Sequence, residues 1–254
     1  MTARDWDAAV YDRVSGPQVR MAGPVLDRLA LEGHETVLDA GCGSGRVTRL
    51  LIERLPRGRV IAVDAAPSMV AAARAALGDR VTVIQSDLAL IELGEHVDAA
   101  FSNAVFHWVF DHDALFRRLH AALRPGGRLV AQCGGAGNVE AFHATVAEVA
   151  AQEPFAPHLG GWEGPWHFAT PGNTRERLER AGFERIEVWL EPYPVVPSHT
   201  HEYLRTVCLG DHVERLPEEL RGPFVSDVVA RCGRPVELDY VRLNIDARRP
   251  LPTS

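Results

Sequence analysis

The sequence contains no lysine, because all 27 of its basic residues are arginine. This absence excludes chemistry of the pyridoxal or aldolase type, which needs a protein amine to form a Schiff base. Cysteine is also scarce. Its four positions, Cys42, Cys133, Cys208 and Cys232, form no CxxC pair, so the sequence indicates neither a zinc site nor a redox motif. We expect small buried thiols and no metal.

Long apolar runs are missing as well, and none approaches the roughly 18–20 residues that a transmembrane helix needs. Residues 1–5 have no apolar core, so we expect no signal peptide and a cytoplasmic protein without membrane partners. The net charge is −7 and no block of basic residues occurs, which argues against a nucleic-acid groove. The 254 residues suffice for one large α/β domain with an added cap.

Strand-like and helix-like segments alternate along the first half of the chain. The pattern predicts strands at 36–39, 60–64, 81–85, 97–102 and 128–133, with helices at 19–31, 45–55, 67–77 and 112–123. Such alternation is typical of an α/β fold, in which parallel strands carry helices on both faces of one sheet.

The second half is organised differently. It predicts strands at 184–191 and 236–247, helices at 138–151, 174–181, 200–209 and 217–231, and a loop at 154–173. Seven strands result, with an insertion before the last. We therefore expect an N-terminal lid helix region (1–33), a ligand-binding core (34–197), a helical cap insertion (198–235), and a final core strand and tail (236–254).

Three glycines, Gly41, Gly43 and Gly45, follow the first predicted strand in the stretch VLDAGCGSG. The dinucleotide fingerprint needs GxGxxG, but residue 46 is arginine, so the pattern here is GxGxG. Asp39 at the strand end would repel a pyrophosphate and attract an ammonium group. S-adenosylmethionine (SAM) carries an ammonium and a sulfonium and no phosphate. The glycines would then allow close approach of the backbone to this ligand.

Two further acids follow the next predicted strands. Asp64 can accept hydrogen bonds from both ribose hydroxyls, and Asp87 can accept one from an adenine amino group. Met69, on the helix after Asp64, could pack on the adenine face. Because ligands of open parallel sheets bind at the carboxyl ends of the strands, we expect Asp39, Asp64 and Asp87 to converge on one edge.

At this point the chain resembles the class I SAM-dependent methyltransferases. The resemblance covers residues 35–133 through the stretches VLDAGCGSG, VIAVDAAPSM, VIQSDL, VDAAFSNAVFHWV and LRPGGRLV. It implies a Rossmann-like, mostly parallel seven-stranded sheet whose last strand is antiparallel, with SAM as cofactor. The expected cofactor-binding residues are Asp39, Gly41, Cys42, Gly43, Gly45, Asp64, Ala65, Met69, Asp87, Leu88 and Asn103.

A narrower resemblance extends beyond this core. The stretches WDAAVYDRVSGPQVR, SNAVFHWVFDH, GNTRERLERAGF and PYPVVPSH look like trans-aconitate methyltransferases, although those enzymes often carry Gln at the position of His107. The segment around His107 and Trp108 also resembles other carboxyl-methylating enzymes, of the malonyl-carrier-protein and juvenile-hormone-acid types. The resemblance implies O-methylation of a small acidic acceptor.

Three residues are candidates for handling the acceptor: His107, Trp108 and Tyr11. A carboxylate acceptor is ionised at pH 7 and needs hydrogen-bond donors, which His107 and the Trp108 indole could supply. A hydroxyl acceptor would need a base, for which His107 is the candidate. His107 could instead be structural. Tyr11, in the N-terminal segment with Gln18, could close the pocket, bond the acceptor, or only pack.

Other aromatic and histidine residues have more than one interpretation. Trp162 and Trp166 could attract a sulfonium and exclude water, or could anchor a surface loop. The pair His199 and His201 is a poor metal signal, and we interpret both as cap or surface histidines.

Four functions compete on this basis. The leading one is O-methylation of a small carboxylate, and the second is methylation of a hydroxyl, nitrogen or carbon atom of a secondary metabolite. Nucleobase methylation is disfavoured, because the stretch from Asn103 to Phe106 lacks the prolines typical of that chemistry. The last is a protein that binds SAM without catalysis.

Overall fold

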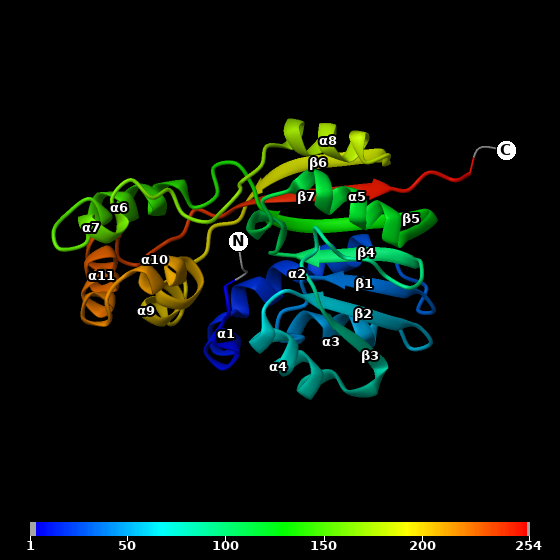
Figure 1. The fold of residues 1–254 in the computed structure, drawn as a ribbon, viewed down its shortest axis with the longest axis horizontal. Helices are drawn as coiled ribbons and strands as arrows, with labels where there is room; N and C mark the ends of the chain where they lie inside the picture. Colours follow the sequence, from blue (N-terminus) through cyan, green and yellow to red (C-terminus); the bar gives the residue numbers. More distant parts are fainter. Residues whose placement is uncertain (1–3, 253–254) are drawn as a thin grey trace.

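The computed structural model describes residues 4–252 and contains one seven-stranded sheet (Figure 1). Its strand order is β3-β2-β1-β4-β5-β7-β6. All neighbouring pairs are parallel except those of β7, which runs antiparallel to both β5 and β6. The predicted α/β fold, with its last strand antiparallel, is therefore confirmed.

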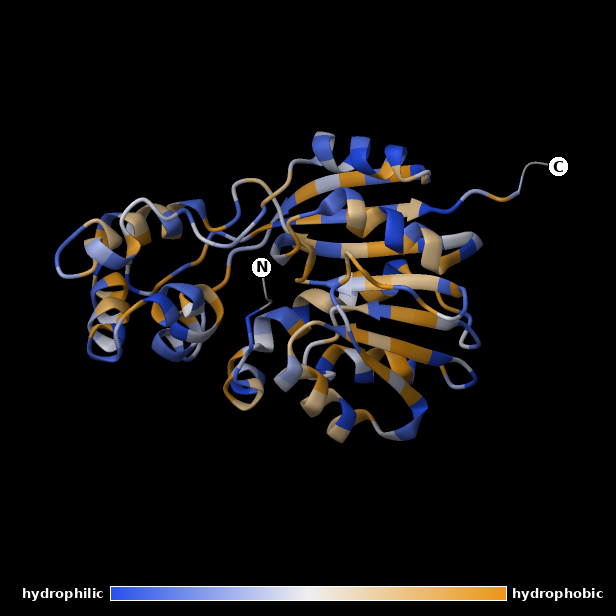
Figure 2. Cartoon of the chain, in the orientation of Figure 1, coloured by the Kyte–Doolittle hydropathy of each residue, from blue (hydrophilic) through white to orange (hydrophobic). Residues whose placement is uncertain are grey.

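The strands are β1 (Thr36–Ala40), β2 (Arg59–Asp64), β3 (Val81–Gln85), β4 (Val97–Asn103), β5 (Leu123–Gly134), β6 (Glu184–Pro192) and β7 (Val241–Arg248). The central strands β1, β2 and β4 are almost wholly buried, as expected for parallel strands covered on both faces. Figure 2 shows the apolar residues concentrated in these strands, whereas helix α8 at the periphery is mostly hydrophilic.

Helices cover the two faces of the sheet. One face contacts α2 (Gly16–Arg28), α3 (Arg46–Glu53) and α4 (Pro67–Leu77), while α5 (His112–Ala122) and α8 (Pro171–Arg180) pack on the other. The short turns η1 (Gly78–Arg80) and η2 (Phe106–Trp108) precede β3 and follow β4. The parallel strands all end on the same side, toward the remaining helices in Figure 1.

Those remaining helices form a cap beyond the strand ends (Figure 1). They are α6 (Glu140–Ala150), α7 (Ala156–Leu159), α9 (Thr200–Tyr203), η3 (Leu204–Cys208), α10 (Gly210–Arg215) and α11 (Glu218–Arg231). Phe142, Val146 and Val149 of α6 share one buried cluster with Phe224 and Val228 of α11. The cap therefore has two segments of chain, and the predicted boundary at residue 198 leaves its first segment, including α6 and α7, in the core.

Several predicted elements differ locally. The predicted helix 200–209 is divided into α9 and the wide turn η3, and the predicted loop 154–173 contains α7. The predicted strand 236–247 enters the sheet only at Val241. Its first residues pair instead with the chain after β6, through hydrogen bonds from Tyr193 N to Tyr240 O (2.7 Å) and from Val195 N to Leu238 O (3.0 Å). These paired segments connect sheet and cap.

The N-terminal segment joins the cap to the core. Helix α1 (Ala8–Val14), which the apolar pattern did not predict, carries Asp12, whose carboxylate accepts a hydrogen bond from Ser44 of the glycine loop. On the cap side, Arg4 forms an ion pair with Glu214 (2.7 Å). The N-terminal segment thus contacts both units next to the strand ends.

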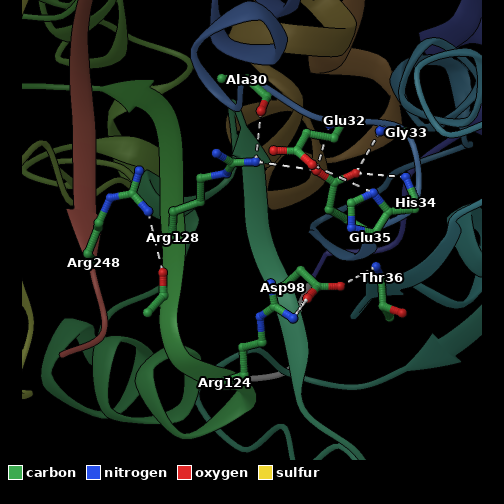
Figure 3. A network of polar contacts seen from close by, with 11 residues as sticks. Ala30, Glu32, Gly33, His34, Glu35, Thr36, Asp98, Arg124, Arg128 and Arg248 are labelled. Carbon is green, nitrogen blue, oxygen red and sulfur yellow. Dashed lines mark hydrogen bonds and ion pairs between the residues drawn. The ribbon is translucent and has the colours of Figure 1, made fainter. Parts of the chain in front are cut away.

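At the opposite end of the sheet, polar contacts tie the loops that enter the strands (Figure 3). Glu35 accepts hydrogen bonds from the backbone N–H groups of residues 32–34 and lies 3.6 Å from the Arg128 guanidinium. Asp98 accepts from Thr36 N (2.6 Å) and pairs with Arg124 (2.6 Å). These residues stabilise the end of the sheet that faces away from the cap.

Candidate active site

A cavity of about 490 Å³ lies at the carboxyl ends of the parallel strands, between the sheet, the N-terminal segment and the cap. Every predicted site residue except Gly45 lines it. The set comprises Tyr11, Asp39, Gly41, Cys42, Gly43, Asp64, Ala65, Met69, Asp87, Leu88, Asn103, His107 and Trp108. The topology therefore brings together residues that are spread over the first half of the chain.

The three glycines of the loop have different surroundings. A Cβ atom on Gly43 would meet nothing within 4 Å, so its backbone is open to a ligand. A Cβ on Gly41 would lie 2.2 Å from a methyl group of Val105. Gly45 caps α3 with φ of 90° and packs against Leu77, 2.9 Å from where its Cβ would be. Gly45 therefore packs against Leu77 and does not line the cavity, and its predicted contact with the cofactor stays a prediction.

Two acids lie under the glycine loop. Asp39 is 1 % exposed and accepts a hydrogen bond from Thr48 Oγ1 (2.7 Å). Its burial, with the nearby charge of Asp64, raises its pKa to about 7. Asp64 is fixed by hydrogen bonds from Gly43 N and Ala66 N (both 2.9 Å), and burial raises its pKa as well. A cationic ligand would stabilise the ionised form of both acids.

Two amide oxygens at the cavity wall have no hydrogen-bond partner within the described chain. They are Gln18 Oε1 and Asn103 Oδ1, both buried. The amide nitrogens of both side chains are occupied. Gln18 Nε2 donates to Tyr203 Oη (2.9 Å), and Asn103 Nδ2 donates to the main-chain carbonyl of Gln18 (3.1 Å). Unpaired buried acceptors call for a donor from a ligand. With the adjacent acids, they fit the ammonium group of SAM.

The part of the cavity lined by Met69 and Leu88 suits a flat ring. Met69 and Leu88 are buried there at 3 % and 4 % exposure, and Asp87 lies beside them. The Asp87 carboxylate accepts from Ala89 N (2.8 Å), which fixes its orientation. This combination of a polar acceptor and apolar faces fits the adenine that the sequence predicts.

His107 lies on η2, just beyond β4, and is 8 % exposed. Its Nδ1 accepts a hydrogen bond from Gly134 N (3.2 Å), so in the neutral ring Nε2 carries the hydrogen. Burial, together with the charge of Arg242 and neighbouring His112, lowers its pKa well below the ordinary value. His107 is therefore a neutral imidazole that can donate from Nε2.

Aromatic rings form the wall on the side of His107. The Trp166 and Phe168 rings are nearly parallel (7°), with centroids 6.1 Å apart, and His143 stacks on Trp166 at 4.5 Å. All three line the cavity, as does Trp108. Trp162 does not line it and packs within the cap under the guanidinium of Arg215, 4.2 Å from the ring centroid.

Tyr11 closes the cavity from α1, where its ring lies 5.4 Å from that of Trp6. Burial, with the nearby charges of Asp64 and Asp12, raises its pKa to about 12. Its phenol is therefore protonated at neutral pH and can donate a hydrogen bond.

Arg242 is a cavity residue that the sequence analysis missed. It lies at the start of β7, opposite Gly134, and is 2 % exposed. Among residues 4–252, no carboxylate lies within 4.0 Å of its guanidinium, and its Nη2 has no hydrogen-bond partner. An alternation of apolar and polar residues places Arg242 and Asn244 on the same face of the strand, which is the signal that could have found it.

Metal ligands and membrane spans were also sought in the described part of the chain. It contains no group of three or more His, Cys, Asp or Glu side chains that could hold a metal ion. His199 and His201 lie at the start of α9, away from the cavity wall. No helix among residues 4–252 combines the length and apolar character needed to cross a bilayer.

Comparison with known proteins identifies relatives for nearly the whole chain. Residues 37–127 match a family model described as a methyltransferase domain. The trans-aconitate 2-methyltransferase of Variovorax paradoxus is 30 % identical over 244 residues, which are 94 % of each chain. That of Methylobacterium radiotolerans is 36 % identical over 233 residues, which are 87 % of this chain and 86 % of the relative.

Solved structures show the same fold. An S-adenosylmethionine-dependent methyltransferase from Mesorhizobium loti is 25 % identical, with a TM-score of 0.54, and the match covers 90 % of this chain and 97 % of that one. Phosphoethanolamine N-methyltransferase 2 of Haemonchus contortus, solved with S-adenosyl-L-methionine, matches with a TM-score of 0.63 at 19 % identity. That match covers 96 % of this chain and 56 % of the other.

Strand order, cavity and relatives therefore agree on one family and one cofactor. The chain is an enzyme that belongs to the class I SAM-dependent methyltransferases and is similar, within them, to the trans-aconitate 2-methyltransferases.

Proposed function

We propose that the enzyme transfers the methyl group of SAM to a carboxylate oxygen of a small acidic molecule. One observation carries this proposal: the polar groups predicted to handle the acceptor are donors and not bases. The Nδ1 atom of His107 is occupied by Gly134 N, and the Tyr11 phenol is protonated at neutral pH. The names of the trans-aconitate 2-methyltransferases that resemble the chain give independent support.

A carboxylate is the acceptor that needs no base, because it is already ionised near pH 7. When bound, SAM supplies an electrophilic methyl carbon, to which a carboxylate oxygen bonds while the carbon–sulfur bond breaks and its electron pair stays on sulfur. No proton is exchanged, so the absence of a base beside the acceptor is no obstacle.

The residues around the acceptor then have a positioning role. The His107 Nε2–H, the Trp108 indole N–H and the Tyr11 hydroxyl can hold the carboxylate oxygens in line with the methyl group. The aromatic wall of Trp166 and Phe168, with the cap behind it, excludes water from the reacting atoms.

A hydroxyl acceptor would require a base, and neither histidine of the cavity suits that role. His143 is the remaining histidine of the cavity, and burial lowers its pKa to about 4. An imidazole with so low a pKa is a poor acceptor for a proton from an alcohol.

Two variants of His107 test the proposal. His107→Gln keeps an N–H donor but removes the imidazole, so we expect it to retain activity within about tenfold of the parent. His107→Ala removes the donor and should lower kcat about 100-fold, because the acceptor loses its alignment. SAM affinity, measured by calorimetry, should be unchanged in both.

The matching control is the pH dependence of kcat in the parent enzyme between pH 6 and 9. Without a catalytic base, no ionisation with the character of an imidazole should appear. A His107→Gln enzyme as inactive as His107→Ala, together with a titrating group in the parent, would identify His107 as a base and refute the proposal.

A further inference from the structure

Three arginines line the cavity, and they differ in their partners and in their burial. Arg4 is paired with Glu214 (2.7 Å) and Asp211 (3.7 Å) of the cap. Arg46 begins α3, beside the glycine loop, where it donates to Ser15 Oγ (2.9 Å) and to the Asp12 carbonyl. Arg242 is the most deeply buried of the three, and no described carboxylate pairs with it.

The Arg242 guanidinium is held by a chain of polar side chains across three strands. Its Nε donates to Oε1 of Gln132 (3.4 Å). Nε2 of the same Gln132 side chain donates to Oδ1 of Asn244 (3.0 Å). Asn244 in turn donates to Glu191 Oε2 (3.2 Å). These contacts occupy the Nε edge of Arg242. Its Nη2 is buried without a hydrogen-bond partner in the described chain, and the residue lines the cavity.

A buried cation without a counter-ion is costly, so its presence in a cavity calls for an anionic ligand. The position of Arg242 decides which ligand this is. It pairs across β5 and β7 with Gly134, whose N–H donates to Nδ1 of His107 on the acceptor side (3.2 Å). Arg46 lies by the glycine loop instead and suits the carboxylate of the methionine moiety. One unpaired cation therefore remains for the acceptor.

The remaining wall on this side is aromatic. The rings of Trp166 and Phe168 are nearly parallel, and His143 is tilted by 20° from Trp166 and by 25° from Phe168. Nearly parallel rings favour a flat ligand that stacks beside them. A second or third carboxylate would meet these rings without a cation to compensate its desolvation.

We propose that Arg242 binds the carboxylate of the acceptor and that this acceptor is a monocarboxylic acid with a flat, unsaturated apolar body. The inference rests on the proposed function and narrows it, because it separates this enzyme from one that methylates a tricarboxylate. Gln132 and Asn244 are positioning residues for the guanidinium.

The first experiment replaces the cation with an apolar side chain of similar length, in Arg242→Met. The KM for a carboxylate acceptor, measured with trans-cinnamate, should rise about 30- to 100-fold, as expected for loss of a buried charged partner. The kcat should change much less than the KM, because the carboxylate loses its charge as the ester forms and Arg242 interacts most with the ground state. SAM affinity should not change.

Arg128→Met is the matched control. Arg128 also belongs to a polar network and lies on β5, 3.6 Å from Glu35 (Figure 3). It lies at the opposite end of the sheet, however, and does not line the cavity. Its KM should equal that of the parent. An unchanged KM in Arg242→Met, or a loss of SAM affinity as large as the rise in KM, would overturn the role of Arg242.

The second experiment needs no variant and decides the acceptor class even if Arg242→Met does not fold. The parent enzyme is supplied with trans-cinnamate, sorbate and trans-aconitate, and the kcat/KM values are compared. We expect the two monocarboxylates to exceed trans-aconitate at least tenfold. A preference for trans-aconitate would overturn the inference and leave the proposed function intact. In parallel incubations with an alcohol and an amine, methylation of these with no carboxylate methylated would overturn both.

Discussion

At the scale of single residues, the buried carboxyl group of Asp39 makes the stability of the protein depend on pH. Its carboxyl group is buried and its pKa is about 7, whereas an aspartate in an unfolded chain titrates near 4. Between these pH values the folded protein binds the proton more tightly than the unfolded chain. The free energy of unfolding of the ligand-free protein therefore falls as the pH rises from about 4 to 7.

Asp39→Asn should remove this dependence. At pH 8 the ligand-free variant should be more stable than the parent, because it has no buried charge to desolvate, while its affinity for SAM should be lower. In the parent, SAM affinity should decrease as the pH falls below 7 and Asp39 becomes protonated. Thermal unfolding at pH 5 and pH 8, with calorimetry of SAM binding, measures both effects.

Asp79→Asn, at an exposed turn, is the control and should resemble the parent at each pH. Equal pH dependence of stability in Asp39→Asn and the parent would contradict the role assigned to this carboxyl group.

The acids and Arg242 differ in how far the sequence could predict them. Asp39, Asp64 and Asp87 each follow a predicted parallel strand, and parallel strands end on the same side of a sheet. Arg242 reaches the cavity because β7 pairs antiparallel with β5 and places it opposite Gly134. That register depends on where β7 enters the sheet, which the apolar pattern over residues 236–247 did not reveal.

At the scale of elements, the contact between the glycine loop and the turn after β4 fixes the site. Gly41 has φ of 93°, and the place of its missing Cβ is filled by the side chain of Val105. Val105 immediately precedes η2, which carries His107 and Trp108. The glycine loop and the turn that carries His107 and Trp108 are therefore packed directly on each other.

Gly41→Ala should destabilise the protein by about 2–4 kcal/mol, from left-handed backbone strain and overpacking against Val105. Adding Val105→Ala should recover part of this loss, because it removes the methyl groups in the way. Gly94→Ala is the control, since a Cβ there meets nothing within 4 Å. Urea unfolding measures all four proteins. Equal stability of Gly41→Ala and Gly94→Ala would contradict this packing.

Helix α6 marks the limit of prediction at this scale. Its existence follows from apolar periodicity, but Phe142, Val146 and Val149 would look the same if they packed on the sheet. Their actual partners on α11 lie far along the chain. Periodicity identifies a buried face and not the surface that buries it, so the two-part cap was not foreseen.

At the scale of the whole molecule, the cavity lies where three parts of the chain meet. The strand ends supply Asp39, Asp64 and Asp87, α1 supplies Tyr11, and the cap supplies Cys208 and Asp211. Arg4 ties the N-terminal segment to the cap, and Asp12 ties it to the glycine loop. A ligand that fills the cavity would contact all three parts at once.

SAM should accordingly stabilise the folded molecule as one unit. At a free concentration 100 times its Kd, it should raise the free energy of unfolding by about 2.7 kcal/mol. Calorimetry should give a single transition that moves to higher temperature as a whole. Two transitions, only one of which responds to SAM, would show that the cap and core do not share the ligand.

The most direct test of the central claim is the chemical form of the transferred methyl group. The parent enzyme is incubated with methyl-labelled SAM and a carboxylate acceptor, and the product is treated with mild alkali. Carboxylate O-methylation predicts a methyl ester, so the label should be released as methanol and the acid regenerated. Label that remains on the acceptor after alkali, as in an ether, an amine or a new carbon–carbon bond, would contradict it.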